Sequence, residues 1–578
     1  MNDVDVLIVG GGPAGSTLAA ILLKYRPEAR VRILERERFP RFHVGETLVA
    51  DINVVLDEMG AYPAVDAAGF VRKYGATFRW GAAPEPWHLL FATMEESRTA
   101  PGQVQTAYTW HVDRAEYDRI LLDTARRAGA ELVIDAAAAL LEEHGRVVGV
   151  RCASGAVHRA RWVVDASGQS GLDGSTAERV MDPHLRNIAY WGYYRGLRYE
   201  PGLNGTHDRS RAFIVAHPAG WSWCFPIRDD LASVGVITRV GGGDKPSVVV
   251  GAGGARTPER HFLDAVADCP ELAGLLADAE LVPYEAGAPL VHVIRDFSYV
   301  AGRMWRPGLV RTGDAAGFVD PILSVGCFLA QSSARHLAYS LATLLGTDSP
   351  MDEPTILDAY ADHTRDTLEA FRELTWFFYK FNARKDDWWA RARELIDSAG
   401  LPAQATDRQA FLAFASGFAA RRAVHREPNG VFGEPFFADA FRHLIAPVGA
   451  AGGDGGGGGE VGAPPRLQRT DRVRLVGAVV RRASAVPLDG SGRVIPALRV
   501  EVLGGGEPGT GGAALVRRIH VPPTMAPLFD WLDGSADVVA LAERLEREIG
   551  SPEAERATLV RYVRGVVAGL LERGLVER

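Results

Sequence analysis

The chain begins with a short apolar run, a cluster of glycines and a longer stretch with helical spacing. Residues 4–9 (VDVLIV) are apolar and β-branched, which is typical of a buried strand, and the helical stretch continues to about residue 25. A second apolar run, VRILER, occupies residues 31–36. Strand, helix and strand in this order predict a β–α–β unit whose two strands run parallel in one sheet.

Alternating and aromatic-rich segments further along the chain predict a second sheet. They fall at about 70–112 and 185–300 and include WSWCFPI and ASVGVITRV. We interpret them as a β-sheet substrate domain inserted into the first unit, so that both together occupy residues 1–350. A helix is expected at about 326–347, and an aromatic-rich helical region at 351–448. The predicted fold class is α/β.

Glycine marks the clearest boundary in the chain. Residues 449–465 (GAAGGDGGGGGEVGAPP) bury too little surface to offset the entropy lost on ordering, so they predict a flexible linker. Residues 466–578 then form a small C-terminal α+β domain that resembles a winged helix, acting as a cap over the active site or as an interaction surface. Strands are expected near 472–481 and 498–521, and helices near 524–533, 536–549 and 552–573.

Composition narrows the class of protein. With 578 residues the chain exceeds one ordinary core, and 47% hydrophobic and 24% charged residues with a net charge of −8 argue against a nucleic-acid-binding protein. No apolar run is long enough to cross a membrane, and the acidic start of the chain does not resemble a signal peptide. The four cysteines lack disulfide or metal-ligand spacing. We expect a cytoplasmic enzyme that binds neither nucleic acid nor membrane.

The glycines between the first strand and helix form a G-x-G-x-x-G motif. Its residues are Gly10, Gly12, Pro13, Ala14 and Gly15. The first glycine makes a tight turn, the second lets the backbone approach a pyrophosphate, and the third lets the helix pack closely. Glu35, 20 residues after Gly15, stands where a carboxylate accepts ribose hydroxyl hydrogens, with Arg36 beside it. Together they predict a Rossmann-type dinucleotide site.

Further segments resemble FAD-dependent hydroxylases and their relatives over residues 1 to about 345. Gly313 and Asp314 in VRTGDAAGFVDP match the segment that contacts the ribityl chain and pyrophosphate, and Asp165 lies in VVDASG, which resembles the strand closing the FAD site. Arg114 in VDRAEYDRIL matches their V-x-R-x-x-F-D segment. Arg41 and Glu46 in RFHVGETL stand where those proteins contact flavin or pyrophosphate. The resemblance implies FAD.

One glycine-rich segment imitates a second nucleotide loop. VVVGAGGARTPERHF, at 248–262, carries Arg256 where the third glycine belongs, and no strand ending in an acidic residue follows at the right distance. We therefore expect no dedicated NAD(P)H domain. Reducing equivalents then come from outside or from transiently docked NAD(P)H.

Three segments resemble flavin-dependent halogenases, especially those that act on phenols, pyrroles or carrier-bound aromatics. Trp221 and Trp223 in GWSWCFP match the family's W-x-W-x-I-P signature, with phenylalanine in place of isoleucine. Lys73 falls where the family has its single catalytic lysine. Pro321 and Gly326 in DPILSVGCFLA match D-P-x-x-S-x-G-V-H-L-A beside the flavin, with departures at positions 327 and 328.

The resemblance implies a halogenase that uses reduced FAD, oxygen and a halide ion. A separate, transiently bound flavin reductase would supply the reduced FAD. Lys73 would hold hypohalous acid by hydrogen bonding or as a chloramine, and burial among Phe78, Trp80 and Trp110 would lower its pKa.

The resemblance also places the halide and the substrate. The turn of Ser324, Val325 and Gly326 before a helix would offer backbone N–H groups to the halide. Trp221 and Trp223, which alternate on a strand and so share a face, would keep the substrate away from the flavin.

The third motif favours particular substrates. The tryptophan-halogenase branch carries a glutamate just before the serine, where this chain has Leu323, so an activated phenol or pyrrole, free or on a carrier protein, is favoured over free tryptophan. Asp296 in RDFSY resembles a segment through which one phenolic branch attaches FAD covalently; an exposed or capping carboxylate is the alternative.

Other interpretations stay open. Lys73 could be a solvated surface lysine, and the two tryptophans could serve only as core. Geranylgeranyl-reductase-like flavoproteins also carry an aromatic-x-Trp-x-Phe-Pro segment, which Phe225 fits. The same fold also accommodates an FAD monooxygenase, a saturating reductase, or a maturation factor that modifies a partner protein or peptide docked by the C-terminal domain.

Overall fold

The computed structural model describes most of the first 380 residues and parts of the C-terminal region. The described residues are 3–80, 86–91, 107–172, 178–199, 208–217, 220–239, 257–295, 297–346, 351–380, 472–475, 478–488, 493–503, 516–521, 531–549 and 576–577. Asp296, the linker at 449–465, residues 381–448 of the predicted helical region and most of the second glycine-rich segment lie outside them.

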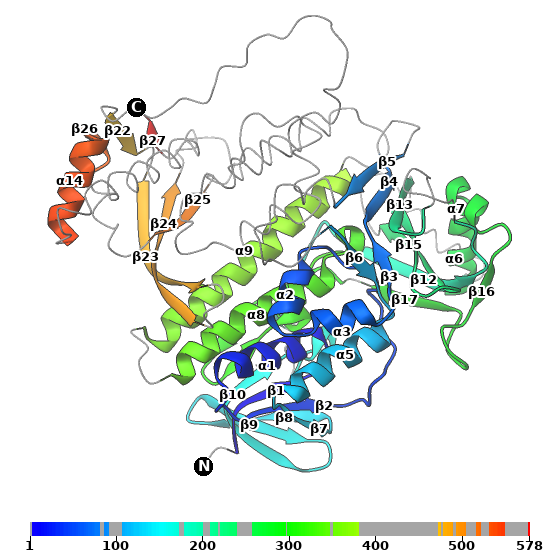
Figure 1. The fold of residues 1–578 in the computed structure, drawn as a ribbon, viewed down its shortest axis with the longest axis horizontal. Helices are drawn as coiled ribbons and strands as arrows, with labels where there is room; N and C mark the ends of the chain where they lie inside the picture. Colours follow the sequence, from blue (N-terminus) through cyan, green and yellow to red (C-terminus); the bar gives the residue numbers. More distant parts are fainter. Residues whose placement is uncertain are drawn as a thin grey trace, which may run out of the picture.

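A parallel sheet forms the layer nearest the N-terminus (Figure 1). Its order is β20-β10-β1-β2-β7, with β1 in the centre: Val6 lies between Val31 of β2 and Trp162 of β10. The predicted β–α–β unit is confirmed as β1 (Val4–Val9), α1 (Pro13–Tyr25) and β2 (Val31–Glu35). The other strands of this sheet are β7 (Glu131–Ile134), β8 (Ala137–Glu143), β9 (Arg146–Cys152), β10 (Val157–Asp165), β19 (Trp305–Arg306) and β20 (Leu309–Arg311).

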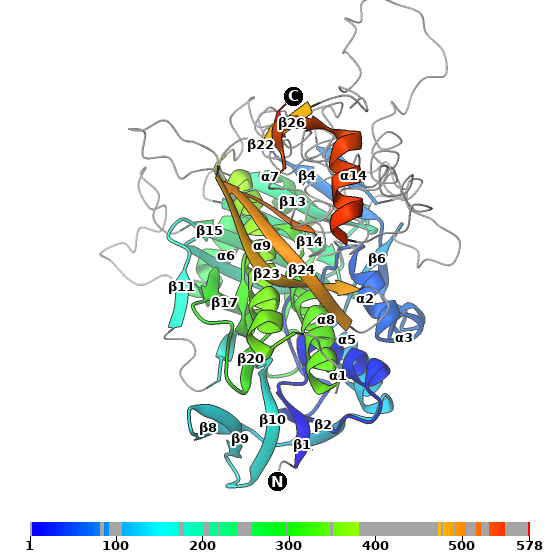
Figure 2. The same cartoon turned by 90° about the vertical axis from the view of Figure 1, so that its left-hand side faces the viewer.

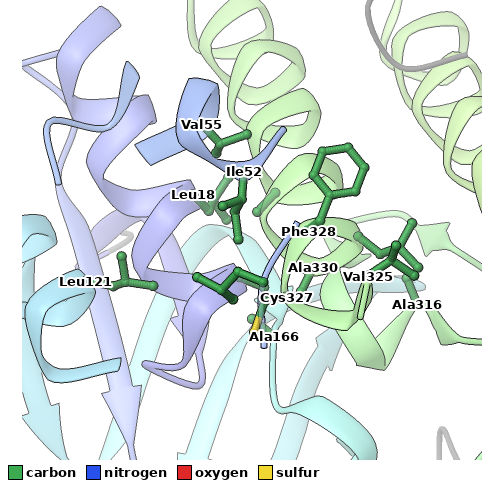
Figure 3. Close-up of a cluster of buried hydrophobic side chains, with 14 of the residues drawn as sticks. Leu18, Ile52, Val55, Leu121, Ala166, Ala316, Val325, Cys327, Phe328 and Ala330 are labelled. Carbon is green, nitrogen blue, oxygen red and sulfur yellow. The ribbon is translucent and has the colours of Figure 1, made fainter. Parts of the chain in front are cut away.

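Five helices of the described residues pack together next to this sheet, and α1 contacts β1 and β2 directly. They are α1, α2 (Ile52–Glu58), α3 (Tyr62–Ala67), α5 (Arg114–Arg127) and α8 (Gly326–Leu345). Helix α8 confirms the helix predicted at about 326–347. Figure 3 shows Leu18 of α1, Ile52 and Val55 of α2, and Phe328 of α8 in one cluster of buried apolar side chains. Helix α8 is buried along nearly its whole length. It lies between the layer of the first sheet and the rest of the molecule.

A second, mostly antiparallel sheet has the order β16-β12-β15-β14-β13-β4-β5, with β17 also paired to β12. Both segments predicted to form the substrate sheet contribute strands to it. The strands are β4 (Gly75–Arg79), β5 (Trp87–Leu90), β12 (Asn187–Arg195), β13 (Arg211–His217), β14 (Gly220–Pro226), β15 (Ala232–Arg239), β16 (Glu280–Val282) and β17 (Val291–Arg295). Helices α6 (Pro258–Ala267) and α7 (Pro270–Leu275) pack on one face through a separate apolar cluster.

Two small sheets complete this part of the chain. One is the ribbon of β3 (Val71–Lys73) and β6 (Thr109–His111), and the other joins β11 (Arg179–Met181), β18 (Tyr299–Ala301) and β21 (Gly317–Phe318). Helix α9 (Glu353–Lys380) lies in the predicted helical region and packs on α8. None of the helices in the described ranges combines the length and apolar composition needed to cross a lipid bilayer.

The C-terminal elements differ in detail from those predicted. They are β22 (Arg472–Leu475), β23 (Ala478–Leu488), β24 (Arg493–Leu503), β25 (Val516–Val521), β26 (Asp533–Asp537), α14 (Val538–Ile549) and β27 (Val576–Glu577). The paired strands β23 and β24 extend beyond the predicted bounds, because Pro487 and Pro496 interrupt the sequence pattern although both positions pair across the hairpin. The helix predicted near 524–533 is wrong at its end, where Asp533 begins a strand.

The C-terminal hairpin contacts the main core. Figures 1 and 2 show β23 and β24 lying across α8 and α9. Val494 of β24 is only 4% exposed and belongs to the main apolar cluster, and its N–H donates to Thr343 Oγ1 of α8 at 3.0 Å. These contacts lie at the C-terminal part of α8, away from the helix start that follows the third motif.

Deletion of residues 466–578 is expected to leave the flavin content unchanged and to lower the melting temperature. The deletion uncovers apolar surface on α8, whereas the neighbours of the glycine loop among the described residues all precede residue 466. Each 1 kcal/mol lost should lower the melting temperature by about 2–4 °C. Thermal unfolding and the flavin-to-protein ratio measure both effects, with Val494→Ala in the full chain as the control for the apolar contact. Loss of soluble, flavin-loaded protein would show instead that the tail belongs to the main fold.

Candidate active site

The glycine loop after β1 has the geometry that the motif requires. Gly10 has a φ of +108°, and a Cβ there would lie 2.3 Å from the carbonyl oxygen of Ala166; a Cβ on Gly15 would lie 1.9 Å from the carbonyl oxygen of Gly10. Gly12 is different, because its φ of −70° suits any residue and a Cβ would meet only the Arg41 guanidinium, at 3.4 Å. Within the described residues no side chain caps α1, so its first N–H groups are left for an anion.

Glu35 lies beside this loop at the end of β2. Its carboxylate accepts hydrogen bonds from the N–H of Gly11 at 2.7 Å and of Glu37 at 2.9 Å, and it is 5% exposed. Each carboxylate oxygen keeps a further lone pair that a ribose hydroxyl can use. Arg36 instead extends along the surface, where it contacts Glu37 and the Ser170 hydroxyl at 3.2 and 3.3 Å. The structure thus brings Glu35 to the loop and leaves Arg36 at its edge.

Two segments from later in the chain meet the same loop. A Cβ on Gly313, whose φ is +61°, would lie 2.7 Å from the Cβ of Ala14, so only glycine allows this approach. The preceding Thr312 donates its N–H to the carbonyl oxygen of Asp165 at 3.0 Å, and the Asp165 carboxylate accepts the N–H of Ser167 at 3.2 Å. The ends of β1, β10 and β20 therefore converge, as parallel strands bring their ligand-binding loops to one edge.

The segment RFHVGETL is held between this loop and the substrate sheet. Arg114 forms two hydrogen bonds with Asp118, at 2.8 and 3.0 Å, and donates to the carbonyl oxygen of Val44 at 2.6 Å. Arg41 also pairs with Asp118, at 3.5 Å. The Glu46 carboxylate accepts the Tyr193 hydroxyl at 2.8 Å, and burial raises its pKa. Burial likewise raises the pKa of Asp314 to about 6.

These groups fit an anionic dinucleotide such as FAD. The glycine cradle and the uncapped helix offer N–H groups to the pyrophosphate, while Arg41 and Arg114 place two guanidinium groups beside it. Glu35 would accept a hydrogen bond from the ribose. Asp296, the candidate for covalent attachment, lies outside the described residues.

Lys73 is buried, which rules out the surface-lysine interpretation. Its side chain is 2% exposed, its ammonium donates to the carbonyl oxygen of Leu48 at 2.7 Å, and its Nζ lies 5.8 Å from the centre of the Phe91 ring. Burial lowers the pKa of Lys73 to about 7. Phe78, Trp80 and Trp110 are buried as well, but Trp110 pairs with Arg72 in the ribbon register and so lies on the other face from Lys73.

The segment DPILSVG forms a tight turn before α8. Residues Pro321–Leu323 make one 3₁₀ turn, Ser324 adopts a left-handed conformation with φ of +59°, and Val325 precedes the first helical residue. A Cβ on Gly326 would lie 3.0 Å from the Phe318 ring, so this position has little space. The N–H of Ser324 donates to the carbonyl oxygen of Pro321 at 2.9 Å, and no side chain caps α8 in the described part of the chain, so Val325 and Gly326 keep the N–H groups that a ligand could use.

The two signature tryptophans share a face of β14, as predicted. Their ring centres lie 5.7 Å apart. The Trp221 indole N–H donates to the Tyr379 hydroxyl at 2.6 Å, and Tyr379 donates to the Asp320 carboxylate at 3.0 Å. Asn187 donates to the same carboxylate at 3.1 Å. This buried network connects the tryptophan signature to the aspartate of the DPILSVG turn, and burial raises the pKa of Asp320 to about 7.

Sequence analysis missed Tyr379 and Asp320 as functional residues. Tyr379 comes from the aromatic run FFYKF, which indicated only a helix, and 158 residues separate it from Trp221. Asp320 is the first residue of the D-P-x-x-S-x-G motif, and its place in that motif was the sequence feature that could have identified it. Tyr379 contacts Trp221 directly and Asp320 contacts Tyr379, so any role of the two in the site would be to position Trp221.

Tyr379→Phe is expected to uncouple oxygen use from product formation while retaining FAD. The substitution leaves the Trp221 N–H and the Asp320 carboxylate without a shared partner, at a cost of about 1–3 kcal/mol in the free energy of unfolding. We expect several-fold less product per oxygen consumed and correspondingly more hydrogen peroxide, measured by product and peroxide assays. Ser233→Ala, which removes the hydrogen-bond acceptor of Trp223 at 3.1 Å, is the control. Unchanged coupling with lowered stability would show a structural role only.

The comparisons with known proteins agree on one family. A family model described as tryptophan halogenase matches residues 5–100 and 93–432. The tryptophan 2-halogenase of Chondromyces crocatus is 30% identical over 405 residues, which is 68% of this chain and 71% of that protein. A 1H-pyrrole-2-carbonyl-(peptidyl-carrier protein) chlorinase of Pseudomonas fluorescens is 32% identical over 353 residues, 58% of this chain and 74% of that protein.

A solved structure gives the same result. The myxobacterial chondrochloren halogenase CndH, an FAD-dependent halogenase, is 29% identical, with a TM-score of 0.58 over 78% of this chain and 98% of that chain. The family model covers well over half of the chain, including the glycine loop, Lys73, the paired tryptophans and the turn before α8. The chain therefore belongs to the tryptophan halogenase family and is a flavin-dependent halogenase that uses FAD and a halide ion.

Proposed function

We propose that this halogenase modifies an activated phenol or pyrrole, free or on a carrier protein, with Lys73 as the catalytic residue. A separate flavin reductase, bound only transiently, delivers the reduced FAD. The observation that carries the proposal is the position of Lys73. It is buried, and its ammonium contacts the backbone of Leu48, two residues after Glu46 in the segment beside the dinucleotide loop. Lys73 would thus lie between the flavin and the bound substrate.

When bound in its reduced form, FAD would react with oxygen and so supply the oxidising power that converts halide to hypohalous acid. In the turn of Ser324, Val325 and Gly326, the N–H groups of Val325 and Gly326 would hold the halide, because the N–H of Ser324 is bonded to Pro321. Lys73 would hold the hypohalous acid at Nζ and polarise its halogen. With a pKa near 7, the amine can serve as a hydrogen-bond donor or form a chloramine. Trp221 and Trp223 would separate the substrate from the flavin.

Leu323 supports the choice of substrate. It is 5% exposed and occupies the position where the tryptophan branch carries a glutamate, so this chain lacks that carboxylate. A phenol or pyrrole needs less help, because its own hydroxyl or N–H raises the electron density of the ring. One relative is named for a carrier-bound pyrrole and another for tryptophan, so the leucine is the feature of this chain that favours the former.

A substrate panel tests the proposal. The purified protein, FAD, NADH and a flavin reductase are incubated with bromide or chloride and with phloroglucinol, free tryptophan, or pyrrole-2-carboxylate, the last both free and loaded on a carrier protein. Mass spectrometry should detect halogenated phenol or pyrrole and much less halogenated tryptophan. Tryptophan as the best substrate would overturn the assignment of substrate class.

A further inference from the structure

The ribbon of β3 and β6 carries buried polar atoms that the proposed function does not yet use. Within the described residues, both ring nitrogens of His111 and the hydroxyl oxygens of Thr109 and Thr47 are buried and make no hydrogen bond. His111 and Thr109 are 0% exposed. Buried polar atoms in native proteins almost always have partners, so a cluster without them indicates a group that binds there.

The strand register places this cluster beside Lys73. Lys73 pairs with Thr109, and Val71 pairs with His111. Residues directly opposite in an antiparallel pair share a face, and so do residues two apart on one strand. Lys73, Thr109 and His111 therefore lie on one face of the ribbon. Thr47, in the segment beside the flavin site, forms a β-bridge to His111.

The other side of the His111 ring faces the tryptophan strand. His111 stacks on Phe225 of β14, with ring centres 5.4 Å apart and planes within 6°. Phe225 lies two positions after Trp223. The imidazole therefore lies near Lys73 on the ribbon and contacts the strand that bears the signature tryptophans.

Burial, together with two nearby cations, keeps this imidazole neutral. Burial lowers the pKa of His111 well below its usual range, and the nearby cations Lys73 and Arg209 lower it further. A neutral imidazole offers one nitrogen as acceptor and one as donor. A hydroxyl or a pyrrole N–H can donate to the first, and the threonine hydroxyls can complete the contact.

We propose that His111, assisted by Thr109, binds the ring hydroxyl or N–H of the aromatic substrate and accepts its proton during halogenation. This inference rests on the proposed function. His111 would also supply a base in place of the glutamate that this chain lacks at Leu323. It would do so from the ribbon of β3 and β6, and not from the turn before α8.

The proton transfers balance for a phenol. As a ring carbon bonds to the halogen of hypohalous acid, the oxygen–halogen bond breaks with its electron pair on oxygen, and that oxygen takes a proton from Lys73 and leaves as water. The phenolic proton passes to His111, which leaves a neutral dienone. The neutral Lys73 amine then takes the proton from the halogenated carbon, and His111 returns its proton to the phenolate. Both side chains end as they began.

The test compares a phenol with its methyl ether in matched variants. His111→Phe keeps the stacking on Phe225 and removes both nitrogens, and Thr109→Val keeps the volume and removes the hydroxyl. His261→Phe is the control, because His261 also contacts an aromatic ring, that of Tyr190 at 4.4 Å between ring centres, but on the α6 side of the sheet. The probes are phloroglucinol and 1,3,5-trimethoxybenzene, whose oxygens carry no proton. Their dissociation constants are measured with the oxidised FAD enzyme, and kcat/KM by mass spectrometry.

We expect His111→Phe to lose roughly 10- to 100-fold in kcat/KM for phloroglucinol and about tenfold in affinity, because the substrate hydroxyl loses its hydrogen-bond acceptor. The ether should keep its rate to within about twofold. Thr109→Val should show the same discrimination on a smaller scale. Equal losses with both probes, or no loss with either, would overturn the role of His111. A wild-type enzyme that halogenates neither probe but does halogenate tryptophan would refute the proposed substrate class, and this inference with it.

Discussion

Lys73→Ala is expected to bind FAD, accept reduced flavin and consume oxygen, and to form roughly a thousandfold less halogenated product than the wild type. The reason is that FAD binding and halogen transfer depend on different residues. In the proposed mechanism the residues that hold FAD surround the glycine loop, whereas Lys73 acts only after the halide has been oxidised. Hydrogen peroxide should replace the product, and oxygen, peroxide and product are measured in the same reaction.

Two further variants sharpen this test. Lys73→Arg should also fail, since a guanidinium cannot form a chloramine and projects its donors differently. Lys24→Ala is the matched control, because Lys24 also donates to a backbone carbonyl, that of Glu58 at 2.9 Å, but on the surface. A monooxygenase of the same fold would keep much of its activity in Lys73→Ala and add oxygen, and a reductase would consume no oxygen productively. Substantial halogenation by Lys73→Ala would show that the lysine is not catalytic.

The double variant Gly12→Val, Glu35→Ala should lose FAD retention while still folding. Gly12 has an ordinary φ, and a Cβ there makes only van der Waals contact with Arg41, so valine adds no backbone strain. Its methyl groups would occupy the space that the pyrophosphate needs, and the ribose would lose its carboxylate. We expect colourless, soluble protein, measured as flavin absorbance per protein after gel filtration.

The controls separate binding from folding. Gly274→Ala and Glu37→Ala change a glycine with open space around it and an exposed neighbouring carboxylate, so both should stay yellow. Gly10→Val should fail to fold, because its Cβ would collide with the backbone of Ala166. Retention of stoichiometric FAD by the double variant would refute the assignment of the N-terminal motif.

Local patterns were enough to predict the start of the fold. The strand at Val4–Val9, the helix from Pro13 and the strand ending at Glu35 follow from short apolar runs and from glycines whose tight contacts permit no side chain. That the loop of Gly313 meets the glycine loop was also predictable, because parallel strands bring the loops at their carboxyl ends together. The contact of Gly313 with Ala14 itself was not.

Partners that depend on the packing of distant elements could not be predicted in this way. Nothing in the aromatic run of α9 indicates that Tyr379 receives the Trp221 N–H, and nothing near Lys73 indicates Leu48 as its acceptor. The lack of partners around His111 becomes visible only when β3, β6 and β14 are placed together. The β23–β24 hairpin was underestimated because its prolines obscure the strand pattern.

The most direct test of halogenation is one product mass spectrum, recorded under ¹⁸O₂ with chloride and again with bromide in its place. Wild-type protein, reduced FAD and a phenol or pyrrole that the enzyme accepts are sufficient. The account predicts a product whose mass follows the halide and shows its isotope pattern, with ¹⁸O absent from the product and present in water. A product that carries ¹⁸O and is the same with either halide would contradict it.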